Sequence, residues 1–302
     1  MQKPPFLKKG DTVTIISPSG KIEPEAILNA IKWLNSWGLE VRLGKNCLNK
    51  WHNFAGTDDE RLFDIQTALN DPEIKAVFCS RGGYGMVRLI ESLYFDEFIK
   101  NPKWIIGFSD VTFLHSCLNN MLGFASVHGP MPLKFPDISK NDVSMAHLKN
   151  TLFGENIVYK IPSKKENIPG KAQGVLIGGN LAVLTNLNGS RSDFDPAEKI
   201  LFIEDIDEYY YQIDRMLWAL ERSHDLSQLN GMVIGQFSSI KDNDIPFGFS
   251  LHQIFLQHFE KYGFPVCFDF PAGHDDPNYT LILGNGLLLD IKPDQTHIEI
   301  LI

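Results

Sequence analysis

The sequence predicts an α/β protein with an N-terminal doubly wound parallel-sheet domain and a C-terminal β-rich α+β domain. Apolar runs such as 12–18 and 74–80 alternate with segments of helical periodicity. These runs are continuously apolar, which is typical of parallel strands covered on both faces. Beyond residue 140 the pattern changes to shorter strand-like runs. We expect the first domain over 1–150, a connection over 151–172 and the second domain over 173–302.

The first domain opens with a β-branched strand that Pro18 stops, followed by a helix over 24–37. Pro24 suits the first turn of that helix, and Gly38 suits its end. The later segments are assigned by the same patterns. We expect further strands over 39–43, 74–80, 104–109 and 125–130, and helices over 58–72, 86–93 and 110–122.

The second domain is expected to begin after a helix-like segment over 140–155 and a polar stretch with two prolines. Its strand-like runs are interrupted by two helical patterns, at 207–221 and 250–262. The runs lie at 174–179, 199–205, 231–238, 265–270, 280–291 and 297–302.

Composition excludes several classes of protein. A hydrophobic share of 43% offers enough apolar surface to offset chain entropy, so a disordered chain is excluded. The formal charge of −9 argues against a general nucleic-acid binder. No stretch of about 20 apolar residues exists, so we expect no membrane span. The N-terminus lacks a signal-peptide pattern, and we therefore expect a cytoplasmic protein.

The four cysteines, Cys47, Cys79, Cys117 and Cys267, lie far apart in the sequence and form no CxxC pair. We expect buried free thiols rather than a disulfide or zinc framework. No metal-ligand motif is present, and we expect neither a metal nor a cofactor.

The most informative local pattern is GFSD at residues 107–110, where a buried strand runs directly into a helix. A serine at such a turn projects its hydroxyl, and the following N–H groups point toward a developing oxyanion. The alternative is that Ser109 or Asp110 only caps the helix. Val111 stands where a full nucleophile-elbow motif has glycine.

A glycine-rich loop, RGGYG at 81–85, follows another predicted strand. The carboxyl edge of an open α/β sheet is where ligands bind. The loop suits a backbone oxyanion donor opposite Ser109, or a tight structural turn. Arg81 is a candidate for binding a substrate carboxylate, or a solvated loop residue.

A catalytic serine needs a base and an orienting carboxylate. His274 follows an apolar strand in a polar loop, and His128 is a competitor at a strand end. Histidines in polar helical or terminal contexts are expected at the surface, namely His147, His224, His252, His258 and His297. Glu204 ends an apolar strand, although it also fits the acidic first turn of the next helix. The order Ser109, Glu204, His274 is the Ser…acid…His order of α/β-hydrolases.

Several motifs together resemble the LD-carboxypeptidase family of serine peptidases, which includes murein tetrapeptide carboxypeptidases and microcin-immunity peptidases. They run in order along nearly the whole chain. The matching segments are ISPSG (16–20), CSRGGYG (79–85), IIGFSD (105–110), HGP (128–130), GGNLAVL (178–184), LFIEDIDEYYYQIDRML (201–217), GQF (235–237) and GHDDPNYTLILG (273–284). Residues 185–200 lack an added aromatic specificity loop, which favours the murein branch.

This resemblance implies a triad of Ser109, Glu204 and His274 in the groove between the domains. It implies backbone oxyanion donors at Asp110 and Gly83. The implied reaction removes the terminal D-alanine from a muropeptide during cell-wall recycling, in an enzyme that is often a homodimer. Two alternatives stay open at this point. One is a related peptidase or amidase that detoxifies peptide–nucleotide conjugates, and the other is a non-catalytic two-domain protein that binds a small ligand.

Overall fold

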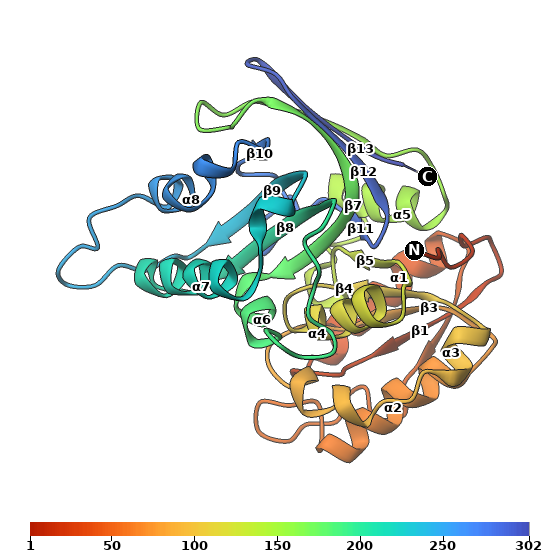
Figure 1. Ribbon diagram of the computed structural model, residues 1–302. Coiled ribbons are helices and arrows are strands. Elements are labelled where there is room, and N and C mark those ends of the chain that lie inside the picture. The colour runs from red at the N-terminus through yellow and green to blue at the C-terminus, as the bar shows by residue number, and fades with distance from the viewer. Residues whose placement is uncertain (302) are drawn as a thin grey trace.

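The computed structural model describes residues 1–301, and it forms two sheets with helices packed around them (Figure 1). The first sheet has six strands in the order β11-β5-β4-β3-β1-β2. All neighbours are parallel except β11, which runs antiparallel to β5. The strands are β1 (Thr12–Ile16), β2 (Glu40–Leu43), β3 (Ile74–Cys79), β4 (Trp104–Gly107), β5 (Ser126–His128) and β11 (Leu281–Leu283).

The helices of this half begin and end at recognisable signals. Helix α1 (Pro24–Ser36) has proline at its first position and ends before Gly38, whose φ is 85°. Helix α2 (Asp58–Asn70) begins with a capping box between Thr57 and Glu60. The remaining helices are α3 (Asp96–Lys100), α4 (Thr112–Ser116) and α5 (Val143–Leu152).

The second sheet has seven strands in the order β10-β9-β8-β7-β12-β13-β6. Strands β7 to β10 are parallel neighbours, and β12, β13 and β6 are added antiparallel to the β7 side. The strands are β6 (Val158–Pro162), β7 (Gly170–Asn180), β8 (Lys199–Ile206), β9 (Gly231–Ser238), β10 (Val266–Cys267), β12 (Gly286–Ile291) and β13 (Gln295–Ile300). The helices are α6 (Leu181–Asn186), α7 (Tyr210–Ser223) and α8 (Leu251–Phe259).

The predicted fold class is confirmed: a mostly parallel sheet in the N-terminal half and a mixed sheet in the C-terminal half. The segment 151–172, expected as a connection, contains the end of α5, strand β6 and the start of β7. The three-part division of the chain stays a prediction. Residue 302 of the expected run 297–302 lies outside the described residues.

Two local predictions are wrong. Residues 86–93 form two short 3-10 helices, Met86–Arg88 and Ile90–Ser92, instead of one α-helix. The segment is anchored at both ends, because Met86 N donates to Asp110 and Tyr94 N donates to Gln66. A 3-10 turn rises about 2.0 Å per residue against 1.5 Å in an α-helix, which suits a short segment fixed at both ends.

The second wrong prediction is the single strand over 280–291. The chain leaves the first sheet after β11, turns at Gly284 with φ 76°, and enters the second sheet as β12. One strand of the N-terminal sheet therefore comes from the C-terminal half. Periodicity could not reveal this, since both pieces are apolar.

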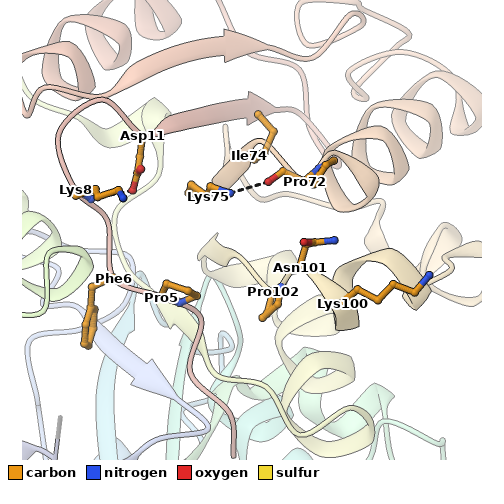
Figure 2. A pocket seen from close by; sticks show the side chains of 10 residues that line it. All are labelled: Pro5, Phe6, Lys8, Asp11, Pro72, Ile74, Lys75, Lys100, Asn101 and Pro102. Atoms are coloured by element: carbon orange, nitrogen blue, oxygen red, sulfur yellow. Dashed lines mark hydrogen bonds between the residues drawn. The ribbon is translucent and has the colours of Figure 1, made fainter.

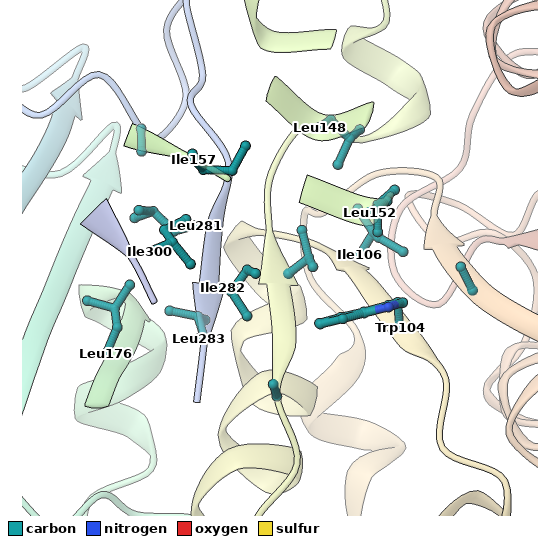
Figure 3. Close-up of a cluster of buried hydrophobic side chains, with 14 of the residues drawn as sticks. Trp104, Ile106, Leu148, Leu152, Ile157, Leu176, Leu281, Ile282, Leu283 and Ile300 are labelled. Atoms are coloured by element: carbon teal, nitrogen blue, oxygen red, sulfur yellow. The ribbon is translucent and has the colours of Figure 1, made fainter. Parts of the chain in front are cut away.

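A single hydrophobic cluster joins the two sheets (Figure 3). Trp104 and Ile106 of β4 pack into the same core as Leu176 of β7 and Ile300 of β13, with β11 between them. The apolar surface buried in this shared cluster holds the two halves in one orientation. No helix among residues 1–301 is both long enough and apolar enough to cross a membrane.

Candidate active site

Ser109 lies in a strained turn between β4 and the helical segment that contains α4. Its φ is 62°, in the left-handed region that residues with a side chain rarely adopt. Gly107 is required two residues earlier, because a Cβ there would lie 2.9 Å from Cγ2 of Val111. The backbone therefore turns sharply enough to present the half-buried serine at the sheet edge, as in a nucleophile elbow.

The Asp110 side chain connects this turn to two loops. Its Oδ2 accepts hydrogen bonds from Ser19 Oγ at 2.5 Å and from Met86 N at 2.9 Å. Burial raises the pKa of the Asp110 carboxyl, and the two hydrogen bonds oppose that effect. The Asp110 carboxylate thus acts as a structural link, which leaves its backbone N–H as the expected oxyanion donor.

The glycine loop lies directly against Ser109. A Cβ on Gly82 would be 2.9 Å from the serine Cβ and 3.0 Å from its Oγ, so only glycine fits. Gly83 follows with φ 111° and lines the same cavity as Ser109. Gly83 was expected at this site, whereas the contact between Gly82 and Ser109 was not.

Buried arginine and backbone contacts hold the loop. Arg61 of α2 donates from Nη1 to the carbonyls of Pro18 and Gly85, at 2.5 and 3.3 Å. Arg81, the sequence candidate for a substrate carboxylate, donates from Nη1 to the carbonyl of Lys21 at 2.9 Å. Its guanidinium lies against the backbone of Gly20. A substrate-binding role for Arg81 stays a prediction.

Glu204 and His274 come together in the second half of the molecule. Glu204 is fully buried on β8, and its Oε2 lies 2.7 Å from Nδ1 of His274. A carboxylate accepts this bond, so Nδ1 carries the hydrogen and Nε2 is free to act as a base. Burial lowers the pKa of His274, but the hydrogen bond and charge of Glu204 outweigh it, and the net pKa is raised.

The loop that carries His274 is anchored by β9. Gln236 accepts from Asp275 N and donates to the Pro277 carbonyl, both at 3.0 Å. Ser238 Oγ donates to the Asp275 carboxylate at 2.5 Å, and Asn278 accepts from Gly273 N. Sequence reasoning did not assign Gln236 a role, although it lies in the quoted GQF segment.

The two halves of the site meet through Phe108. The ring of His274 packs against the ring of Phe108, the residue before Ser109, with centroids 4.8 Å apart. Within residues 1–301, no hydrogen bond joins Ser109 Oγ to His274. Catalytic hydrogen bonds are often long in a ligand-free enzyme and shorten when substrate binds.

Asn180 and Thr112 fix the helical segment that follows Ser109 to the second domain. Asn180 N donates to Thr112 Oγ1 at 3.1 Å, and Asn180 Nδ2 donates to Asp205 at 2.8 Å. Asp205 also accepts from the amides of Ala182 and Ile206. Burial, with the neighbouring charge of Glu204, raises the pKa of Asp205 to about 7.

The other histidines of the region are packed groups. His128, the competitor for the base, is buried between Phe108 and Phe202, and burial lowers its pKa well below its ordinary value. His115 contacts the Gly107 carbonyl through Nε2 at 2.9 Å, and burial lowers its pKa to about 4. His258, expected at the surface, is buried in α8 with Nε2 3.0 Å from Asp214 of α7, because these helices pack together.

Two cavities adjoin the candidate residues. A cavity of about 370 Å³ includes Ser109, Asp110, Gly83 and Asp205 in its lining. A much smaller one, of about 10 Å³, lies beside His274 and Lys134.

A further cavity of about 350 Å³ lies at the opposite edge of the first sheet, where β1 and β3 begin (Figure 2). It contains none of the candidate residues. No group of three His, Cys, Asp or Glu side chains within 1–301 is placed to hold a metal ion.

The fold and this chemistry define a serine-type hydrolase. Comparison with known proteins gives the family. Residues 13–129 match the LD-carboxypeptidase N-terminal domain, and residues 173–289 match the LD-carboxypeptidase C-terminal domain. The chain therefore belongs to the LD-carboxypeptidase family, as its sequence motifs indicated, and it is a serine-type carboxypeptidase.

Similar proteins extend over nearly the full chain. The probable murein peptide carboxypeptidase of Bacillus subtilis is 37% identical, over 93% of this chain and 89% of its own length. The murein tetrapeptide carboxypeptidase of Pseudomonas aeruginosa is 30% identical, over 92% of each.

Solved structures show the same fold. The muramoyltetrapeptide carboxypeptidase of Oxalobacter formigenes superposes with a TM-score of 0.87 at 31% identity, covering 96% of this chain and 98% of the other. An MccF-like protein from Bacillus anthracis superposes with a TM-score of 0.86 at 23% identity, covering 99% of each chain, and shares the fold.

Proposed function

We propose that this carboxypeptidase removes the terminal D-alanine from murein tetrapeptides. The observation that carries the proposal is the buried Glu204–His274 pair packed beside the strained Ser109 turn. The names of the relatives in Bacillus subtilis and Pseudomonas aeruginosa support the substrate class.

In this mechanism, His274 Nε2 takes the proton of Ser109 Oγ as the serine attacks the scissile carbonyl. Glu204 holds the imidazole tautomer through Nδ1 and stabilises the imidazolium that forms. The backbone N–H groups of Asp110 and Gly83 bind the oxyanion. Removing one such donor costs about 10²–10³ in rate in comparable enzymes.

Collapse of the tetrahedral intermediate breaks the amide bond, and the imidazolium donates its proton to the departing amine of D-alanine. Water then enters, His274 removes one of its protons, and the hydroxide attacks the acyl-serine ester. The second collapse releases the shortened peptide and returns the proton to Ser109. The 370 Å³ cavity beside Ser109 has room for the acyl portion of the substrate.

The loop between α6 and β8 favours a murein peptide over a nucleotide conjugate. Phe194 is the one aromatic residue in 187–198, and it is buried with its ring stacked 4.1 Å from that of His224. It is therefore not exposed to stack on a base.

The direct test incubates the enzyme with free tetrapeptide and follows the loss of one alanine by mass spectrometry. Ser109→Ala should abolish the loss, while Ser223→Ala, at the exposed end of α7, should retain wild-type activity. Full activity of Ser109→Ala would reject the nucleophile assignment. Cleavage of a peptide–nucleotide conjugate without cleavage of the tetrapeptide would reject the proposed substrate.

We further propose a cytoplasmic homodimer that acts in peptidoglycan recycling, as the family resemblance implies. Sedimentation of the purified protein tests the dimer, with a single monomeric species as the contrary result. Cell fractionation tests the location.

A further inference from the structure

The small cavity beside His274 differs in size and charge from the one beside Ser109. Its volume of about 10 Å³ is about that needed by a single water, whereas the cavity beside Ser109 measures about 370 Å³. Lys134 is the one cationic side chain besides His274 in its lining. The site therefore has a large cavity beside Ser109 and a small, lysine-bearing cavity that Phe108 and His274 line.

The mechanism determines which end of the substrate occupies the small side. His274 must protonate the departing amine, so the C-terminal residue lies next to His274 in any productive complex. In an α-amino acid that amine is joined through one carbon to the terminal carboxylate. Because the exposed Lys134 and His274 line the same region, a carboxylate next to His274 comes within reach of Lys134, and the larger cavity is left for the bulky acyl chain.

The Lys134 backbone is held firmly while its ammonium is available. It ends a 3-10 helix (Pro132–Lys134) in which Leu133 N donates to the Ser80 carbonyl at 2.9 Å. Within residues 1–301 Lys134 forms no ion pair, unlike Lys50, Lys100 or Lys261. Its charge reaches His274, where it acts to lower the imidazole pKa.

Aspartate side chains also line the small cavity, but two of them already accept hydrogen bonds. Asp142 accepts from Met145 N at 2.9 Å, and Asp275 accepts from Ser238 Oγ at 2.5 Å. Asp276 is exposed to solvent. An incoming carboxylate would meet Lys134 as its available cation.

We propose that Lys134 binds the terminal carboxylate of the departing D-residue and so restricts the enzyme to the chain end. This inference rests on the proposed carboxypeptidase function. It assigns to Lys134 the role that the sequence analysis gave to Arg81, whose guanidinium lies against the backbone of residues 20 and 21.

The experiment compares kcat/KM for a tetrapeptide ending in D-alanine with kcat/KM for the same peptide ending in D-alaninamide. The wild type should prefer the free acid. Lys134→Met should lower kcat/KM for the free-acid peptide roughly 10- to 100-fold, because a charge-assisted hydrogen bond is lost. The same substitution should change kcat/KM for the amide peptide by less than about threefold. Lys134→Arg should restore much of the preference, and Lys140→Met, an exposed lysine six residues on, should match wild type.

Each outcome is decisive. If Lys134→Met keeps the wild-type preference for the free acid over the amide, the proposed role of Lys134 is wrong, while the carboxypeptidase function stands. Loss of the preference in Arg81→Met instead assigns the carboxylate to Arg81. Absence of cleavage of either peptide by the wild type rejects the proposed function together with this inference.

Discussion

Glu204 Oε2 lies 2.7 Å from His274 Nδ1, and the glutamate side chain has no exposed surface. The pair joins β8 to the loop after β10, so the acid and the base come from segments 70 residues apart. A buried charge is tolerated only with a close partner, and here the partner is the imidazole itself.

The first prediction concerns the pH dependence of the reaction. In the proposed mechanism neutral His274 is the base, so kcat/KM should rise as the pH increases through its raised pKa. Glu204→Gln removes the charge that raises this pKa. The rising limb should therefore move to lower pH, while kcat falls by about 10³-fold or more because the tautomer is no longer fixed.

A pH–rate profile of both proteins checks this prediction. If the rising limb of the Glu204→Gln profile lies at the same pH as in wild type, or at higher pH, that limb does not report the ionisation of His274. Circular dichroism of the variant at each pH controls for loss of the fold.

The second prediction tests the close approach of Gly82 to the nucleophile. A methyl group there would lie 3.0 Å from Ser109 Oγ and 3.5 Å from Asp110 N, so it would displace the serine or the oxyanion donors. Gly82→Ala should lower kcat by about 10²–10³-fold. The melting temperature should fall as well, because Gly82 is buried and the added methyl group overpacks its contact with Ser109, so kcat is compared at a temperature where both proteins are folded.

Gly10→Ala is the matched control. Gly10 has φ 89° and no atom within 4 Å of the added Cβ, so it tests backbone strain without contact. This variant should lose about 1 kcal/mol of stability and keep its kcat. Equal kcat values for Gly82→Ala and wild type would show that the loop does not constrain Ser109.

Much of this arrangement could be predicted from the chain alone. Residue chemistry and position at predicted strand ends made Ser109, Glu204 and His274 candidates, and the family resemblance combined them into a triad. Local pattern could not show that Glu204 and His274 would pair, since that contact depends on how β8 and the loop after β10 are placed by the whole sheet.

The missed features all depend on tertiary context. The sequence could not show which of Gly82 and Gly83 contacts Ser109, because that depends on which Cα faces the serine in the folded chain. His258 was expected at the surface since its neighbours are polar, but α8 turns it toward α7. Lys134 follows HGP in a segment without periodicity, and only the folded chain places it beside His274.

The third prediction concerns the hydrogen bond between Ser19 and Asp110. Both side chains are buried, and their oxygens lie 2.5 Å apart. Asp110→Ala should lower the free energy of unfolding by about 2–4 kcal/mol, because Ser19 Oγ and Met86 N both lose their acceptor. Ser19→Ala should cost less, since Met86 N keeps its partner.

A double-mutant cycle of these substitutions, read by urea unfolding, measures the coupling. We expect a coupling energy of about 1–2 kcal/mol. Additive effects within error would mean that the link between the first loop and the nucleophile turn contributes nothing to stability.

The fourth prediction follows from Asp205, whose pKa in the folded protein is raised to about 7 by burial and by the charge of Glu204. In the unfolded chain an aspartate titrates near a pKa of about 3.9. Between these values the folded state binds more protons, so this group makes stability fall as the pH rises, by up to about 1.4 kcal/mol per pH unit. The stabilising contribution is complete below pH ~4 and is lost as the pH passes about 7.

Asp205→Asn has no titrating group at this position, so the unfolding free energy of wild type minus that of the variant should fall from pH 4.5 to pH 7.5. Asn180→Ala removes one donor to the carboxylate but keeps the titrating group. It should lower stability and, because the lost hydrogen bond had lowered the Asp205 pKa, extend the fall in stability to higher pH than in wild type. A wild-type to Asp205→Asn difference that stays constant across this range would show that the Asp205 carboxylate is already ionised in the folded protein at pH 4.5, and that its three hydrogen bonds outweigh its burial.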